Sequence, residues 1–182
     1  MIASAALIQG SHVAYYTFSA INWQLHGFGG LTIAGLWTLG VIAEIVVFAL
    51  SPRFSLHPST LIAIGGVSAV VRWIVTAQEP PLALLVIVQL GHGLTFGMTI
   101  IGTMSLLVQR VPSHQIARGQ GYYAACNGLL GAITSIASGA IYARIGDSLY
   151  YVMAAMAAAG ALVIWSARHR LKAHPQSEDS GG

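Results

Sequence analysis

Charged side chains are scarce in this chain. Lys, Arg, Asp and Glu make up 7% of its 182 residues, whereas soluble domains contain about 25%. Cysteine is nearly absent too, and the single Cys126 excludes an intrachain disulfide framework. The N-terminus lacks the basic residues that precede the apolar core of a cleavable signal peptide. By contrast, 55% of the residues are hydrophobic and the mean hydropathy is +0.72. We infer an all-α integral membrane protein.

Long runs without charge predict six membrane-spanning helices. The first 43 residues carry no charged side chain, which is enough for one span, a break near residues 24–30 and the start of a second span. The predicted helices lie at about residues 2–23, 31–50, 60–77, 81–108, 119–142 and 149–167. They form a transmembrane bundle over residues 1–172, and the polar tail of residues 173–182 is expected to be disordered.

The basic residues predict the orientation of the bundle. Six spans place both termini on one side of the membrane, together with Arg53, Arg110, Arg118, Arg168, Arg170 and Lys172. The opposite loops hold only Arg144. This bias places the termini in the cytoplasm, in the inner (plasma) membrane of the cell. The basic residues are scattered singly between the spans, so they favour lipid headgroups of the bilayer as partners and not nucleic acid.

Three titratable or charged side chains fall inside predicted spans. Glu44 lies roughly 12 Å, and Arg72 roughly 18 Å, from the cytoplasmic end of its helix at about 1.5 Å per residue. His92 lies near the middle of the fourth span. A charge at a helix centre costs about 2.5–3.5 kcal/mol on insertion scales, so such residues normally have a partner and a function. We expect Glu44, Arg72 and His92 to share one central layer.

Two interpretations of this layer are open. In the first it is a proton site, because burial disfavours an ionised carboxylate, a nearby guanidinium favours it, and movement of Arg72 would therefore switch the proton affinity of Glu44. In the second, Glu44 and Arg72 form a static ion pair that only holds two helices together. His92 could likewise serve only as a hydrogen-bonding residue between helices.

Polar residues also recur along one face of two predicted helices. In the first helix they are Gln9, His12, Tyr16, Ser19 and Trp23, and in the fifth they are Gln120, Tyr123, Asn127 and Thr134. Such faces line a cavity or join helices, with Trp23 placed as an interfacial anchor. Small residues predict close helix packing along a second stripe of the fifth helix, Gly128, Ala132, Ser135 and Gly139, and in the fourth helix at Gly93 and Gly97.

Three strings resemble a known family. Residues 14–24 (AYYTFSAINWQ), 36–44 (LWTLGVIAE) and 70–73 (VVRW) look like the phenylpropionate-permease branch of the major facilitator superfamily. Such transporters have two six-helix halves, each a 3+3 inverted repeat, with the substrate held between them. The resemblance implies that this chain corresponds to the C-terminal half.

The lactose-permease group is a more distant resemblance. It implies that Glu44, Arg72 and His92 match a glutamate, an arginine and a histidine in the second, third and fourth helices of that half. The chain departs from the pattern at Thr95, where that group has a proton-carrying glutamate, and at Gln89, where it has a lysine. If coupling exists here, Glu44 or the missing half must carry more of it.

We therefore predict the C-terminal half of a proton-coupled symporter for a small organic solute, without a cofactor. Glu44, Arg72 and His92 would couple the proton, and an aromatic carboxylate is the substrate class that the resemblance implies. The residues expected to bind substrate are Gln9, His12, Tyr16, Gln89, Tyr123 and Asn127. Its partners would be the substrate, the proton, the lipid bilayer, and a missing N-terminal six-helix half or a second copy.

Two alternatives come from other classes. An inactive or regulatory truncated permease would have the same spans, because one half cannot enclose a cavity made by two. An intramembrane serine protease would need a GxSG motif, but Ile136 occupies the first glycine position before Ser138, and no histidine lies inside the last span.

Overall fold

The computed structural model describes residues 1–172 of the chain, and all regular secondary structure in this part is helical. The predicted tail, residues 173–182, lies outside the described residues. The α-helices are α1 (Ile2–Gly10), α2 (Val13–Leu25), α3 (Gly30–Leu50), α4 (Pro58–Thr76), α5 (Leu82–Leu90), α6 (Met98–Arg110), α7 (Ile116–Ile145) and α8 (Leu149–Lys172). Short 3₁₀ turns occur at η1 (Ser51–Arg53), η3 (Ser113–Gln115) and η4 (Gly146–Ser148), and η2 (Gly93–Gly97) is a π-helical turn.

Two of the predicted spans are interrupted. Only Ser11 and His12 separate α1 from α2, and η2 joins α5 to α6. In the described part of the chain, four helical stretches are long and apolar enough to cross a membrane: Gly30–Arg53, Pro58–Thr76, Leu82–Arg110 and Ser113–His169. The last contains both α7 and α8. The all-helical, apolar architecture agrees with the expected fold class, whereas six spans and a 3+3 repeat stay predictions.

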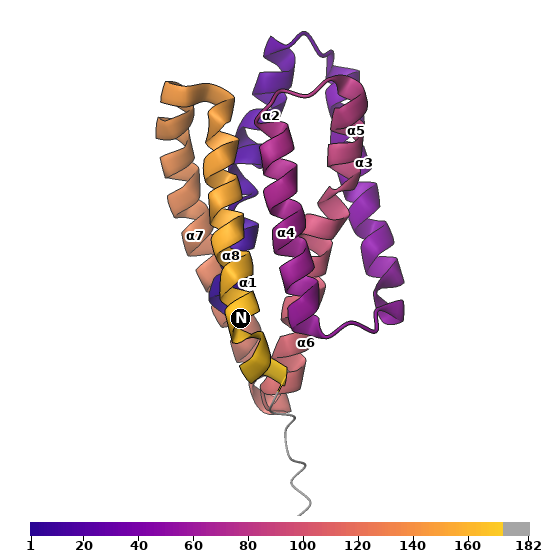
Figure 1. Ribbon diagram of the computed structural model, residues 1–182, viewed down its shortest axis with the longest axis vertical. Coiled ribbons are helices and arrows are strands. Elements are labelled where there is room, and N and C mark those ends of the chain that lie inside the picture. Colours follow the sequence, from indigo (N-terminus) through magenta and orange to yellow (C-terminus); the bar gives the residue numbers. More distant parts are fainter. Residues whose placement is uncertain (173–182) are drawn as a thin grey trace, which may run out of the picture.

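The connections gather at two ends of an elongated bundle (Figure 1). The α2–α3, α4–α5 and α7–α8 connections lie together at what we call the carboxylate end, because Glu79 and Asp147 lie there. The α3–α4 and α6–α7 connections and the end of α8 lie at what we call the basic end, which holds Arg53, Arg110 and Arg168. These acidic and basic residues, which lie far apart along the sequence, are thus gathered at opposite ends of the bundle.

Small residues allow the central helices to approach closely. A Cβ atom at Gly160 of α8 would lie 2.8 Å from the carbonyl oxygen of Ser4 in α1, and the Ser4 hydroxyl donates a 2.7 Å hydrogen bond to the Gly160 carbonyl. Around this contact the core is formed by fully buried side chains, among them Ile8, Ile62, Leu106, Leu149 and Ile164. Close backbone approach through glycine is typical of helix packing in membranes.

The π turn η2 packs directly on α3. A Cβ atom at Gly93 would lie 2.5 Å from the carbonyl oxygen of Ala43, and one at Gly97 would lie 2.9 Å from Val47 Cγ1. The packing role expected for Gly93 and Gly97 is thus confirmed. Since Ala43 precedes Glu44 and Gly93 follows His92, this contact sets the distance between those two side chains.

The small stripe of α7 has no such neighbour. Within residues 1–172, no atom lies within 4 Å of a Cβ built on Gly128 or Gly139. Large apolar side chains on the same helix are open as well, with Ile136 80% and Leu129 66% exposed. The close packing predicted for this stripe does not occur inside the described chain.

Candidate functional site

Arg72 of α4 is the centre of a buried polar network. Its side chain is 4% exposed. Nε donates to the Val88 carbonyl (3.1 Å), Nη1 to His92 Nδ1 (2.9 Å) and Nη2 to Gln89 Oε1 (3.3 Å). The guanidinium carbon also lies 4.6 Å from the centroid of the Tyr15 ring and 4.7 Å from that of Trp73. Neutral acceptors and aromatic faces thus surround the cation, and both kinds of contact stabilise a desolvated guanidinium.

The bond from Arg72 fixes the protonation pattern of His92. Arginine has no lone pair to offer, so His92 Nδ1 accepts this bond and cannot carry a proton while it lasts. The proton of the neutral ring is therefore on Nε2. That atom faces Glu44 Oε2 across 3.7 Å, which is within the range of an ion pair but longer than a hydrogen bond. The Glu44 side chain is 24% exposed, against 9% for His92.

The prediction of a direct ion pair between Glu44 and Arg72 is wrong. Among residues 1–172 the two ion pairs are His26–Glu79 and His92–Glu44, and Arg72 belongs to neither. The physical reason is the packing: Arg72 on α4 is directed at α5, whereas Glu44 lies on α3, which packs on the π turn. His92 stands between them as a neutral bridge. The Arg72–His92 and His92–Glu44 contacts nevertheless bring the three residues together.

The polar face predicted for the first helix is divided by the break at Ser11 and His12. His12 is fully buried, with Nδ1 3.0 Å from the Ile8 carbonyl and Nε2 3.0 Å from Thr95 Oγ1. Gln9 is 5% exposed, and its Nε2 donates to the Phe96 carbonyl at 3.4 Å. Tyr16, by contrast, is 43% exposed. His12 therefore joins the Arg72 network through Thr95, whereas Gln9 bonds to the backbone of Phe96 and Tyr16 lies at the open edge.

Sequence reasoning missed the central positions of Thr95 and Tyr15. Thr95 is fully buried, and its hydroxyl lies 3.0 Å from His12, 3.5 Å from Arg72 Nη1 and 3.1 Å from the His92 carbonyl. The Tyr15 hydroxyl donates to Gln89 Oε1 at 2.5 Å. The departure at position 95 was a signal for Thr95, but nothing in one sequence separates Tyr15 from its neighbour Tyr16.

Aromatic rings cover the open edge of the network. Tyr16 stacks on Trp37 with ring centroids 5.8 Å apart, and Tyr15 lies 4.9 Å from the same ring. Phe96 stacks on His92 at 5.3 Å and meets His12 edge-on at 6.0 Å. This aromatic wall lies beside Glu44. A ligand with a flat ring and an ionisable group could therefore stack its ring on the wall and place its ionisable group near Glu44.

The remaining predicted binding residues differ in their surroundings. Gln89 is 1% exposed and accepts from both Tyr15 and Arg72 through Oε1, while its Nε2 has no hydrogen-bond partner among the described residues. Tyr123 of α7 is buried, and its hydroxyl is likewise without a partner there. Asn127 is half-buried on the same helix. Gln89 belongs to the network, whereas no hydrogen bond within residues 1–172 joins Tyr123 or Asn127 to it.

A second polar cluster closes the carboxylate end. His26 Nε2 lies 2.9 Å from Glu79 Oε2, and Asn22 donates to Asp147 at 2.5 Å. The hydrogen bonds of His26 with the Asn22 carbonyl and then with Glu79 raise the pKa of His26 above 6.5. The cluster ties the end of α2 to the α4–α5 loop and to the α7–α8 turn. It is separate from the Arg72 network.

A cation and two histidines buried between apolar helices, with a carboxylate at the open edge, are typical of polar sites in membrane transport proteins. The chain belongs to the MFS_1 like family of the major facilitator superfamily, whose sequence model matches residues 1–153. The apolar, all-helical architecture agrees with membership of this family of membrane proteins.

One curated relative shows the same relationship. The chain is 35% identical over 158 residues to the "Probable 3-phenylpropionic acid transporter" of Escherichia coli (strain K12), a match that covers 86% of this chain and 42% of that protein. The chain thus spans less than half the length of this relative. No solved structure gives a significant match.

Proposed function

We propose that the chain is the C-terminal half of a proton-coupled symporter for a small organic solute, an aromatic carboxylate such as 3-phenylpropionate. The name of the relative supports the substrate class, and the 42% of its length that is covered supports a half-length unit. The half is proposed to lie in the inner membrane with both termini in the cytoplasm, because the basic end then faces the cytoplasm.

A second six-helix unit is the proposed partner. The open small stripe of α7 around Gly128 and Gly139, and the exposed Leu129 and Ile136, offer a surface for close contact with another helix. An N-terminal half would complete a two-half transporter. A second copy of this chain is the other candidate for the same place.

Glu44 is the proposed proton carrier, and one observation supports this above the others. His92 Nδ1 is occupied by Arg72, whereas Glu44 is partly open and faces His92 Nε2 at 3.7 Å. Of the two side chains, only Glu44 can gain or lose a proton without breaking a hydrogen bond of the network. His92 relays the protonation state of Glu44 to Arg72, because it contacts both side chains.

The same arrangement accounts for coupling to an anion. An ionised Glu44 repels a carboxylate and claims the Nε2–H of His92. Protonation of Glu44 removes the repulsion, and His92 Nε2–H then donates to the carboxylate of the solute. The aromatic part of the solute stacks on Tyr16 and Trp37. Proton and anion are thereby bound together.

The test is uptake of radiolabelled 3-phenylpropionate by cells, with and without an uncoupler. Glu44→Gln is expected to abolish uncoupler-sensitive uptake and to spare counterflow exchange, since the amide mimics the protonated carboxyl. Glu79→Gln is the matched control, because this carboxylate lies in the separate cluster, and it should transport normally. Net uncoupler-sensitive uptake by Glu44→Gln would contradict the proton role.

A second arm tests the partner. The chain is expressed alone and together with a candidate N-terminal half. Uptake only when both are present supports the half-permease, and uptake by the chain alone supports a second copy. No uptake in either case, despite insertion into the membrane, would favour the inactive or regulatory alternative or another substrate.

A further inference from the structure

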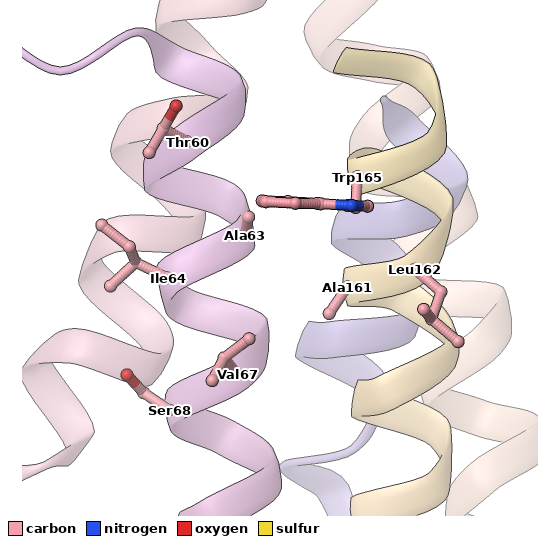
Figure 2. A pocket seen from close by; sticks show the side chains of 8 residues that line it. All are labelled: Thr60, Ala63, Ile64, Val67, Ser68, Ala161, Leu162 and Trp165. Carbon is pink, nitrogen blue, oxygen red and sulfur yellow. The ribbon is translucent and has the colours of Figure 1, made fainter.

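A long apolar groove runs between α4 and α8 on the surface of the bundle (Figure 2). It encloses about 520 Å³, within the range of about 300–1,000 Å³ typical of ligand sites. The walls are almost wholly hydrocarbon and include Ala63, Ile64, Val67, Ala161, Leu162 and Trp165. Figure 2 shows the Trp165 ring reaching from α8 across the groove toward Ala63 of α4.

The groove lies beside the polar network, and Ser68 lines both this groove and the neighbouring one that includes Arg72. On α4, Gly65 packs against Thr99 of α6, and Val67 lies two residues further, about 200° around the helix. Val67 is 58% exposed and Leu162 of α8 is 67% exposed. Both helices belong to the apolar stretches that can cross a membrane. Since the groove is on the outer surface of those stretches, hydrocarbon chains of the bilayer are the solvent that it meets.

A cation stands at one end of this groove. Arg168 follows Trp165 by one helical turn, at the basic end, and its guanidinium carbon lies 3.3 Å from the centroid of the Trp165 ring. Its Nε donates to His169 Nε2 at 3.3 Å. Within residues 1–172 the ion pairs are His26–Glu79 and His92–Glu44, so Arg168 belongs to neither. A tryptophan and an arginine at this depth are characteristic of the level of the lipid headgroups.

We propose that the α4–α8 groove binds one phospholipid with an anionic headgroup, its acyl chain along the groove and its phosphate at Arg168. The hydrocarbon walls match the acyl chain, and Arg168, which forms no ion pair within residues 1–172, matches the headgroup. Arginine recognises phosphate through paired N–H groups, and the terminal nitrogens of Arg168 form no hydrogen bond within residues 1–172. None of the residues that accept a hydrogen bond from Arg72 lines this groove.

Bromine-labelled phospholipids test the proposal, because bromine on an acyl chain quenches tryptophan fluorescence on contact. The natural polypeptide is reconstituted in vesicles of brominated phosphatidylglycerol or brominated phosphatidylcholine, and the Trp165 component is obtained by difference from Trp165→Phe. Trp23 and Trp73 are 4% and 0% exposed, so they contribute little to quenching. One arginine near the surface predicts a preference of about fivefold for the anionic lipid.

Four variants separate the two parts of the site. Arg168→Gln should remove the preference for the anionic lipid, and Arg168→Lys should keep most of it. Val67→Phe should fill the groove and reduce quenching by both lipids. Val71→Phe is its matched control, because Val71 is 57% exposed but lines the neighbouring groove with α5.

Two results would overturn the assignment. Equal quenching of Trp165 by the two lipids, or an unchanged preference in Arg168→Gln, would refute headgroup recognition. If neither lipid quenches Trp165, the groove is covered by protein, either a second copy of this chain or another chain.

Discussion

Replacement of Gly93 by alanine tests how the spacing between α3 and the π turn controls the site. The new methyl group would lie 2.5 Å from the carbonyl oxygen of Ala43, and real Cβ atoms are essentially never found closer than 3.0 Å. The two backbones must therefore separate by about 0.5 Å or more. Because Glu44 and His92 are the next residues on either side, their 3.7 Å contact should open beyond 4 Å.

The expected cost follows from overpacking, which typically destabilises by about 1–3 kcal/mol. This corresponds to a melting temperature lower by about 3–9 °C for a chain of this size. Proton-driven uptake should fall to below about a tenth, because a displacement approaching 1 Å is enough to disrupt a positioned pair of groups. The assays are thermal unfolding of the purified protein and uncoupler-sensitive uptake.

Gly40→Ala is the matched control at the same interface. Its Cβ atom would lie 3.6 Å from the His92 side chain, an ordinary van der Waals distance. This variant should fold and transport normally, and it gains stability because alanine is a better helix former than glycine. Wild-type stability and uptake in Gly93→Ala, or equal defects in both variants, would refute the reasoning.

Three further results are expected. The raised pKa of His26 means that its protonated form stabilises the fold. The contribution of the His26–Glu79 pair to stability is therefore fully present below pH 6.5 and is lost as pH rises through the raised pKa. Melting temperature followed from about pH 5 to 8 should show this loss, and His26→Gln should abolish the pH dependence. Arg72→Lys should destabilise by about 1–3 kcal/mol, since an ammonium cannot make the three directed bonds of the guanidinium; unchanged thermal unfolding would contradict this. Tyr15→Phe should cost only about 1 kcal/mol in the same assay, because Gln89 Oε1 still accepts from Arg72; a loss several times larger would show that the hydroxyl has another partner.

The helices were predictable because their positions depend on local composition, which can be read along the chain. Runs without charge and the Gly-rich segment at residues 24–30 set the ends of α2 and α3 to within a few residues. The break at Ser11 and the π turn at Gly93 were not predicted, since both interrupt apolar stretches without changing their composition. These two interruptions determine which side chains turn inward.

The partners within the site could not be read from spacing. Similar depths in the membrane suggested that Glu44 meets Arg72, but depth does not say which helices are adjacent. The π turn places His92 between them and brings Thr95 to His12 and Arg72. Such contacts depend on helix rotation, which a single sequence specifies only where a polar stripe is continuous.

The buried arginine has an electrical consequence. In the proposed symport cycle Arg72 and an ionised Glu44 carry opposite charges, so in the empty form these two residues together move no net charge across the membrane. When a proton neutralises Glu44 and a monovalent carboxylate binds, the loaded form is neutral as well. Neither crossing then responds to voltage, which acts with about 2.3 kcal/mol per elementary charge per 100 mV. Uptake of an acid would follow the pH gradient alone, whereas an uncharged solute would leave the loaded form with one positive charge, pulled inward by a negative interior.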